Sequence, residues 1–314
     1  MINIISEYLN SKEEKRCIVK ENESLKEYNT FKIGGTAELL VMPEDCETLI
    51  GLIKVLKQHD IKYYILGNGS NVLISDGYLS GVFIVLSRMN NIDAQGDYIY
   101  ADCGAGLNKL AGIAKDNGLA GLEFAYGIPG TLGGAVYMNA GAYGGQMSDV
   151  ICSSKYLDLD TLEIKVLSAR AHLFGYRKSI FNVGHDALGV PQSKKNNFLI
   201  LSSVLELTRG EKSEIDALML KNMAARKDKQ PLEYPSAGSM FKRGENYFAA
   251  KLIEDCGLKG LSVGGAQISE KHSGFIINTG GASFSDVINL IEQVKSAVFE
   301  KTGVKLEREV KIIE

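Results

Sequence analysis

The sequence predicts a fold that combines helices and strands, α+β or α/β, and excludes an all-β sandwich. The first observation is the order of elements near the beginning of the chain: strand, helix, strand, polar loop, strand. The second is the length of 314 residues, which exceeds the roughly 250–300 residues at which one hydrophobic core usually stops growing and favours two or three domains. The third is the composition, 45% apolar and 23% charged, which is typical of a globular protein and argues against disorder.

The pattern of apolar residues supports each element of the first half. Strands are predicted over 36–42, 63–66, 81–86 and 97–102. The first helix starts at Pro43-Glu44-Asp45, because proline and acidic residues favour a first turn, and it places Leu49, Leu52, Ile53 and Leu56 on one face. A second helix runs from Leu107 and is closed by Gly118, and a short one is expected over 130–138.

The second half becomes helical after a boundary at 208–210. Before it, strands are predicted over 154–159, 163–167 and 198–207. After it, amphipathic helices are expected over 213–229, stopped before Pro231, and over 249–256, ended by Gly257. A last helix is expected to open with Ser285 as its N-cap and to bury Val287, Leu290, Ile291, Val294 and Val298.

Charge and cysteine usage exclude several function classes. The net charge of −3 offers no electrostatic footprint for nucleic acid and no polybasic patch for a membrane surface. We expect neither a signal peptide nor a transmembrane helix, since no run of about 20 apolar residues exists. The five cysteines contain no CxxC pair and the four histidines no HxxxH or HExxH spacing, so reduced thiols and no metal site are expected.

Glycine is in excess, with 34 residues in the chain and 12 of them in 101–150. A first group, the glycine loop Gly67 to Asn71 (GNGSN), follows a predicted strand. Glycines permit positive φ, so successive backbone N–H groups can converge on an anion such as a pyrophosphate. An ordinary polar β-turn remains the alternative.

Two familiar phosphate motifs do not match. The stretch CGAGLNKLAG has Gly104 and Gly106 between a strand and a helix, but Lys109 stands where the dinucleotide fingerprint needs a third glycine. We interpret it as a strand-to-helix turn. No GxxxxGK[ST] sequence exists, which excludes a P-loop nucleotide-binding site.

The second glycine segment, 127–145, reads GIPGTLGGAVYMNAGAYGG and is longer than any turn requires. Its glycines let backbone lie against a planar ligand, while Thr131, Tyr137, Asn139 and Tyr143 offer hydrogen bonds and ring contacts. Two glycine-lined segments would suit a long cofactor with a phosphate middle and an aromatic end. FAD is such a molecule.

Eight motifs together resemble those of the UDP-N-acetylenolpyruvoylglucosamine reductase (MurB) family, in its shorter second subtype. Each is weak alone, but their order along the chain makes the resemblance specific, and it runs from about Tyr28 to the end of the sequence. The motifs are YNTFKIGGTAE, ILGNGSNVLISD, the second glycine segment, YRKSIF, PSAGSMFKR, LIEDCGLKG, GGAQISEKHSGFIIN and LEREVKII.

The resemblance implies an α+β fold. It consists of an FAD-binding module of the PCMH (vanillyl-alcohol-oxidase) type, made of two α+β subdomains, and a C-terminal α+β substrate domain. We expect an N-terminal segment at 1–27, the FAD-binding domain at 28–209 (subdomains 28–87 and 88–209) and the substrate domain at 210–314. A cytoplasmic monomer is expected.

The resemblance also implies two half-reactions of peptidoglycan precursor synthesis. NADPH delivers hydride to FAD and leaves. Reduced flavin N5 then passes hydride to the vinyl carbon of UDP-N-acetylglucosamine enolpyruvate, which gives UDP-N-acetylmuramate. FAD should be bound non-covalently, because no histidine lies between His59 and His172 to link it near either glycine segment.

Three residues match the family's catalytic positions. Hydride transfer leaves negative charge next to the substrate carboxylate, and Arg177 of YRKSIF matches the fixed guanidinium that stabilises it. Ser239 of SAGSMF matches the proton donor, although an unassisted hydroxyl is a poor acid. Glu309 of EREVKII matches the glutamate that supports the enolate with Arg177. Ser236 and Glu307 are the residues most easily confused with them.

The motifs that contain the expected binding residues are less specific than those of the catalytic positions. Lys229 and Lys242 are expected to meet the substrate diphosphate, and Gln267 the sugar or flavin. For His272 we favour a structural hydrogen-bonding role over that of a catalytic base. FAD contacts are expected at Gly67, Asn68, Gly69, Ser70, Asn71, Gly130, Thr131, Gly133, Gly134 and Asn139.

The chain departs from the family pattern in two places. Gly244 follows Phe241-Lys242-Arg243 where many relatives carry proline, which puts the phosphate geometry there in doubt. The segment 182–197 is longer than the usual turn, and we favour a surface excursion over a lid. Two other functions stay open: a sugar oxidase on the same fold, and a flavin- or nucleotide-binding sensor without turnover.

Overall fold

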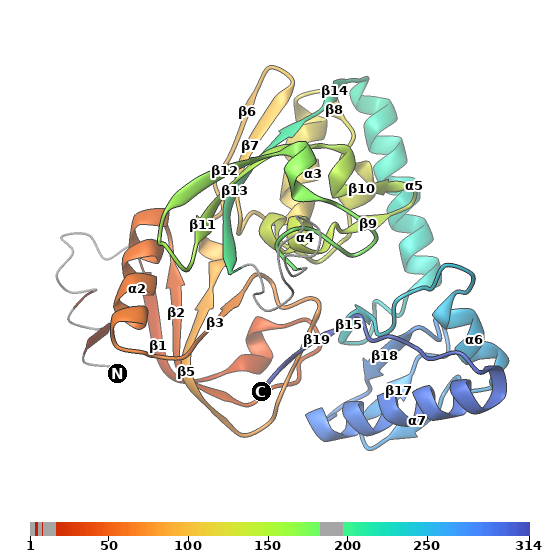
Figure 1. The fold of residues 1–314 in the computed structure, drawn as a ribbon. Coiled ribbons are helices and arrows are strands. Elements are labelled where there is room, and N and C mark those ends of the chain that lie inside the picture. Colours follow the sequence, from red (N-terminus) through yellow and green to blue (C-terminus); the bar gives the residue numbers. More distant parts are fainter. Residues whose placement is uncertain (1–3, 6–7, 9–16, 183–196) are drawn as a thin grey trace. The chain divides into compact units, whose positions relative to one another are not determined.

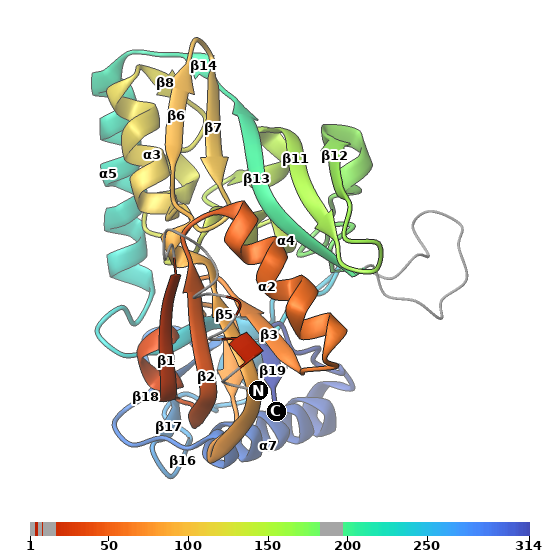
Figure 2. The same cartoon turned by 90° about the vertical axis from the view of Figure 1, so that its left-hand side faces the viewer.

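A computed structural model describes residues 4, 5, 8, 17–182 and 197–314 (Figures 1 and 2). This part of the chain divides into two compact units that are not contiguous in sequence. Unit 1 comprises Met1–Val19, Val41–Asn68 and Val82–Ala224, and unit 2 comprises Lys20–Leu40, Gly69–Gly81 and Ala225–Glu314. The expected functional domains, 28–209 and 210–314, are divided differently and stay a prediction. The expectation for 182–197 falls, except for its end residues, outside the described residues.

The mixture of helices and sheets confirms the predicted α+β class. A four-stranded sheet has the order β1-β2-β5-β3, and β3 and β5 run parallel. Its strands are β1 (Cys17–Ser24), β2 (Thr36–Pro43), β3 (Tyr63–Leu66) and β5 (Tyr78–Val85). The predicted strands at 36–42, 63–66 and 81–86 are confirmed with shifted ends, whereas β1 was not predicted.

Unit 1 is built around a five-stranded antiparallel sheet of order β12-β11-β13-β7-β6 (Figure 2). Helix α4 packs on β13 and β7, and α3 packs on β6. The bounds are β6 (Ile92–Gln95), β7 (Tyr98–Asp102), α3 (Leu107–Asp116), α4 (Leu132–Met138), β11 (Ile151–Asp158), β12 (Ile164–Ser168) and β13 (Phe198–Glu206).

Shorter elements complete unit 1. Two-stranded pairs join β8 (Leu119–Ala120) to β14 (Thr208–Arg209) and β9 (Gly141–Ala142) to β10 (Gly145–Gln146). Helix α2 (Cys46–Gln58) has Asp45 as its N-cap, whose side chain accepts the amide N–H of Thr48 at 2.8 Å. The expected start at Pro43 was wrong, because Pro43 is the last residue of β2. The predicted face of α2 is confirmed, since all four leucine and isoleucine side chains named above are buried.

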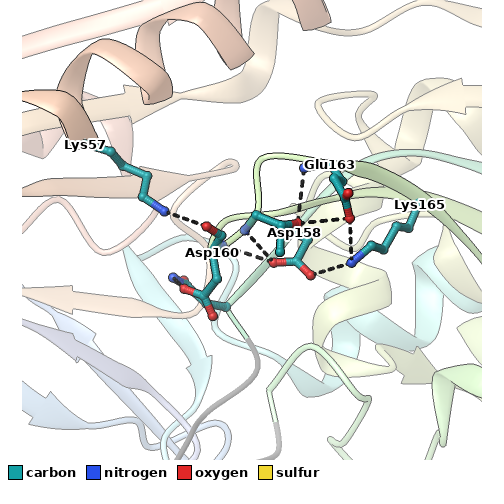
Figure 3. A network of polar contacts seen from close by, with 7 residues as sticks. Lys57, Asp158, Asp160, Glu163 and Lys165 are labelled. Carbon is teal, nitrogen blue, oxygen red and sulfur yellow. Dashed lines mark hydrogen bonds and ion pairs between the residues drawn. The ribbon is translucent and has the colours of Figure 1, made fainter.

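A polar network links α2 to the turn between β11 and β12 (Figure 3). The ammonium of Lys57 donates to the carbonyl of Leu159, and Lys165 lies 2.8 Å from Asp158 and 3.2 Å from Glu163. Burial alone would raise the pKa of Asp158, but hydrogen bonds from Lys165 and from the turn amides outweigh it and leave the pKa lowered. A charged carboxylate therefore closes this turn.

Helix α5 (Lys212–Lys229) confirms the helix expected over 213–229. Its buried side chains recur at helical spacing and form one face, but two of them are polar and Leu218 and Leu220 are exposed, so the amphipathic prediction is only partly confirmed. The buried side chains are Ile215, Met219, Asn222 and Arg226.

Unit 2 contains a four-stranded sheet of order β15-β18-β17-β16. Helix α7 packs on β16, β17 and α6. The bounds are β15 (Ser236–Ser239), α6 (Ala249–Asp255), β16 (Ser262–Val263), β17 (Ala266–Ile268), β18 (Phe275–Asn278) and α7 (Phe284–Thr302). The last strand, β19 (Lys311–Ile313), pairs in parallel with β4 (Val72–Ile74), far away in the sequence.

The start of α7 corrects one prediction. The N-cap is Ser283 and not Ser285, because the Ser283 hydroxyl accepts the amide N–H of Asp286 and the Asp286 carboxylate accepts that of Ser283. This capping box satisfies two amide groups at once. The five predicted core residues of the helix are all buried.

Candidate functional site

The structure brings the beginning of the glycine loop against the second glycine segment within unit 1. The side-chain amide of Asn68 donates to the carbonyl of Pro129 at 2.7 Å. A Cβ atom on Gly67 would lie 2.3 Å from the Thr131 hydroxyl oxygen, so only glycine fits here without a shift. These two contacts support the expectation that the two segments form one site.

The rest of the glycine loop belongs to unit 2. Gly69 has φ +59, and its carbonyl accepts the amide N–H of Thr30 at 3.3 Å. The carbonyl of Asn71 accepts the amide of Lys311 at 3.0 Å. The amides of residues 68–71 donate to no acceptor among the described residues. A run of four backbone donors of this kind is the chemistry that an anion requires.

The amides of the second glycine segment are used differently. Those of Leu132 and Gly133 donate to the carbonyls of Ala105 and Cys103, both at 2.8 Å. These bonds hold the segment against the turn before α3. A Cβ on Gly104 would lie 1.8 Å from the Leu86 carbonyl oxygen, so this glycine is required by packed backbone. The interpretation of 104–106 as a strand-to-helix turn is confirmed.

Asn139 follows α4 and is almost completely buried. It adopts the left-handed conformation (φ +43) at the helix C-cap. Its side-chain oxygen accepts the amide N–H of Ser148 at 2.9 Å, and its side-chain nitrogen donates to the carbonyl of Gly175 at 3.0 Å and to Gln146 at 3.3 Å. This expected FAD contact therefore uses its amide group within the protein.

Arg177 lies on the arginine turn, residues 175–178. Gly175 and Lys178 exchange backbone hydrogen bonds of 3.0 and 3.1 Å, which places Tyr176 and Arg177 at the corners. Arg177 has φ +54, and its guanidinium carbon lies 5.2 Å from the centre of the Tyr176 ring. A non-glycine residue in this conformation costs of order 1–3 kcal/mol and needs support from its surroundings.

Ser239 ends β15 in unit 2. The strand pairs with β18 through an irregular register between Ser236 and Ser239, where Gly238 has φ +74. The amide of Met240 donates to the carbonyl of Gly274 at 2.8 Å. These contacts fix the backbone on both sides of the predicted proton donor.

Glu309 is brought next to the Ser239 segment. Its amide donates to the carbonyl of Met240 at 2.9 Å, and Phe241 and Arg308 form an antiparallel bridge. Glu309 is only 7% exposed, which is unusual for a glutamate. Two of the three predicted catalytic residues therefore lie on adjacent segments of unit 2, and Arg177 lies in unit 1.

The predicted substrate contacts have different surroundings. Lys242 forms an ion pair with Glu307, the residue named as the alternative to Glu309. Gln267, in β17, donates to Ser262 at 3.0 Å and to the carbonyl of Gly260 at 3.3 Å. Lys229 is exposed at the end of α5. No contact among the described residues tests their proposed roles.

Two histidines have pKa values lowered by burial. His272 accepts the amide N–H of Gly274 at 3.1 Å, which supports its structural role. His172 is completely buried, with its ring nitrogens 2.9 Å from the carbonyl of Ser168 and 2.8 Å from the hydroxyl of Ser154. Burial lowers the pKa because it penalises the charged imidazolium.

The matches to known families cover the FAD-binding and C-terminal parts of the chain separately. Residues 37–166 match an FAD binding domain, and residues 230–313 match the C-terminal domain of UDP-N-acetylenolpyruvoylglucosamine reductase. The chain is 48% identical over 292 residues to the reductase of that name from Caldanaerobacter subterraneus subsp. tengcongensis, covering 93% of this chain and 92% of the relative. This chain belongs to the UDP-N-acetylenolpyruvoylglucosamine reductase family.

Other relatives agree with the assignment to the reductase family. The Clostridium novyi protein of the same name is 46% identical over 295 residues, which cover 94% of this chain and 92% of that protein. Among solved structures, UDP-N-acetylenolpyruvylglucosamine reductase (MurB) from Thermus caldophilus matches with a TM-score of 0.76 and 33% identity, covering 95% of this chain and 99% of that one. The chain is thus an FAD-binding oxidoreductase of the reductase family, and neither the sugar-oxidase nor the sensor alternative gains support.

The residues of this reductase fit FAD. The amides of 68–71 are four consecutive donors suited to a pyrophosphate, and the close approach of Gly67 to the Thr131 hydroxyl holds this loop against the second glycine segment. All five cysteines are free thiols, and no cluster of three potential metal ligands occurs among the described residues. In the described parts of the chain, no helix is both long and apolar enough to cross a membrane.

Sequence reasoning missed two side chains next to Arg177. Ser179 donates its hydroxyl to the carbonyl of Tyr137 at 2.7 Å, and Asn182 donates to the same carbonyl at 2.6 Å. The signal was present in the sequence, because a serine and an asparagine flank two apolar residues just after Arg177 and Lys178. Such short polar side chains favour local bonds to backbone.

Proposed function

We propose that this enzyme uses NADPH to reduce UDP-N-acetylglucosamine enolpyruvate to UDP-N-acetylmuramate, a step of peptidoglycan precursor synthesis. Family membership supports the reaction class. The observation that carries the proposal is the placement of a buried Glu309 beside the Ser239 segment, through the bond between the Glu309 amide and the Met240 carbonyl. We further propose that the enzyme acts in the cytoplasm as a monomer.

FAD, when bound, supplies hydride chemistry between NADPH and the vinyl carbon of the substrate. We assign its pyrophosphate to the amides of the glycine loop, Gly67 to Asn71. The remaining contacts that we propose are Gly130, Thr131, Gly133 and Gly134. The side chain of Asn139, which was expected among them, is hydrogen-bonded within the protein.

Arg177 stabilises the charge that develops on the substrate. Hydride addition to the terminal vinyl carbon makes the neighbouring carbon and its carboxylate enolate-like. A guanidinium suits this charge because it stays protonated and can donate two parallel hydrogen bonds to a carboxylate. The two backbone hydrogen bonds that close the arginine turn support such a role, since a preorganised donor costs little reorganisation during the reaction.

Ser239 then donates its proton to the enolate-like carbon. The serine hydroxyl is a weak acid, so the transfer depends on the charge of the carbon and on neighbouring groups. Glu309 supports the enolate together with Arg177. Its low exposure favours a strong interaction, because electrostatic effects increase where water is excluded.

The substrate diphosphate is assigned to Lys229 and Lys242, and the sugar or flavin to Gln267. Lys229 is exposed and therefore available to an anion. Lys242 would have to exchange its ion pair with Glu307 for one with phosphate. Ion pairs with exposed partners contribute only about 0–1 kcal/mol, so this exchange carries a small cost.

The test separates the two half-reactions by stopped-flow absorbance of the flavin under anaerobic conditions. Ser239→Ala should leave flavin reduction by NADPH nearly unchanged and slow reoxidation by the enolpyruvyl substrate by about 10²–10⁴-fold, the usual contribution of a positioned proton donor. Ser236→Ala is the matched control, because the bonds that tie Ser236 to Thr30 use its backbone atoms. Equal slowing of both half-reactions by Ser239→Ala would contradict the proton-donor role.

A further inference from the structure

The arginine turn is held to the end of α4 by three side chains. Asn139 donates to the carbonyl of Gly175, and Ser179 and Asn182 both donate to the carbonyl of Tyr137. All of these residues belong to unit 1. The segment that contains the proposed FAD contacts is therefore bonded directly to the turn that carries Arg177.

Asn139 uses both ends of its amide in this arrangement. Its oxygen accepts from the backbone of Ser148, and its two N–H groups have the Gly175 carbonyl and the Gln146 side chain as acceptors. The residue is 2% exposed. A cofactor contact through the Asn139 amide nitrogen would have to replace one of these bonds.

The type of residue at 139 also follows from the backbone. Asparagine is one of the few residues other than glycine that adopt the left-handed conformation readily. It can therefore end α4 and still extend a donor to Gly175. Aspartate has the same shape and keeps an acceptor for Ser148, but it lacks the donor and presents a carboxylate to the Gly175 carbonyl.

The Gly175 carbonyl connects Asn139 to the turn that carries Arg177. Gly175 is the first residue of the turn, and its own carbonyl also accepts the Lys178 amide that closes it. Arg177 has an unfavourable φ, so the turn depends on outside bonds to keep one conformation. A displacement of about 1 Å in a catalytic group can cost about 10²-fold in rate.

We propose that Asn139 is a positioning residue that fixes Arg177 through the Gly175 carbonyl, and that it does not contact FAD through its side chain. The inference rests on the proposed function, in which Arg177 acts on the substrate. It assigns to Asn139 a role in the second half-reaction. If Asn139 contacted the cofactor directly, its substitution would instead weaken FAD binding.

The experiment compares Asn139→Asp, Arg177→Lys and the double variant by FAD titration and by the two stopped-flow half-reactions. Asn139→Asp should bind FAD within about twofold of the parent and slow reoxidation by the enolpyruvyl substrate by about 10- to 100-fold. In the Arg177→Lys background the same substitution should have little further effect, because residues that act through one another are not additive.

Asn117→Asp is the matched control. Asn117 is also the C-cap of a helix in unit 1, and its side chain donates to the carbonyl of Ile113 at 2.8 Å. Its other hydrogen bonds go to Ala114 and Arg209 and not to the arginine turn. It should leave both half-reactions unchanged. If Asn139→Asp does not fold, Asn139→Gly replaces it, since glycine keeps the left-handed backbone and removes the amide.

Three outcomes would overturn the inference. They are a loss of FAD affinity that accounts for the lost activity, unchanged reoxidation in Asn139→Asp, and full additivity with Arg177→Lys. Failure of the proposed function has a different signature. In that case Arg177→Lys by itself would leave reoxidation by the substrate unchanged.

Discussion

The three residues proposed as catalytic could be chosen from the sequence only because they stand inside motifs. An arginine, a serine and a glutamate are common surface residues, and nothing in their type marks Arg177, Ser239 or Glu309. The structure adds the low exposure of Glu309 and the positive φ of Arg177. The partner of Asn139 could not be predicted, because Gly175 lies 36 residues away and the contact depends on the fold.

His172 gives a residue-scale prediction about stability and pH. Its ring is surrounded by the hydroxyl of Ser154, the carbonyl of Ser168 and the rings of Phe174 and Phe181, and Ser154 is in turn 2.7 Å from Ser203. Burial lowers the folded-state pKa below the unfolded value of about 6.5, so the unfolded chain binds a proton first as pH falls. The stability from neutral His172 should be present above about pH 6.5 and be lost below it.

The measurement is urea unfolding of the flavin-loaded enzyme at pH 7.5 and 5.5. One such group changes the free energy of unfolding by at most about 1.4 kcal/mol per pH unit. His172→Gln should be less stable at pH 7.5 but lose less stability on acidification. His272→Gln is the comparison, because the pKa of His272 is lowered in the same direction. An unchanged pH dependence in His172→Gln would show that this histidine does not titrate as argued.

Apolar periodicity predicted the long elements but not the short ones. The helices α2, α3, α5 and α7 were predicted close to their observed bounds because each repeats a buried face. The strands of unit 2 have only two to four residues and lie among glycines, so they show no alternation. At α7 the deciding signal was Asp286, three residues after Ser283 and in the position that a capping box requires.

The contact between the two glycine segments gives an element-scale prediction. Gly67→Ala would place a Cβ 2.3 Å from the hydroxyl oxygen of Thr131, which is 4% exposed and has little room to move. Overpacking of this kind usually costs about 1–3 kcal/mol. If the shift moves the loop, FAD affinity should fall roughly tenfold or more, as measured by flavin fluorescence on titrating the apoprotein.

Gly112→Ala is the control for this substitution. Gly112 lies inside α3, and an added Cβ would meet nothing within 4 Å. Alanine is a better helix former than glycine, so this variant should keep its FAD affinity and be slightly more stable. Gly67→Ala with the affinity of the parent would remove the glycine loop from the proposed cofactor site.

At the scale of the whole molecule, the sequence predicted the order of motifs but not how distant segments combine. Unit 2 includes the segments 20–40 and 69–81, which precede most of unit 1 in the chain. Its core contains Phe31, Ile33 and Leu73 together with residues of α6 and α7. Pairing between segments more than 200 residues apart leaves no local pattern, so sequence periodicity could not reveal it.

This arrangement predicts that residues 210–314 do not fold alone, although they were expected to form the substrate domain. The isolated segment would lack β4, the partner of β19, and the Phe31 carbonyl that accepts a hydrogen bond from Asn278 at 3.2 Å. It would also expose the apolar surface that Phe31, Ile33 and Leu73 cover. Circular dichroism during urea unfolding should therefore show no cooperative transition for 210–314. Co-expression with 1–209 should restore one, because the missing strand and core side chains are then supplied. A cooperative transition in 210–314 by itself would mean that these early segments are dispensable to the unit.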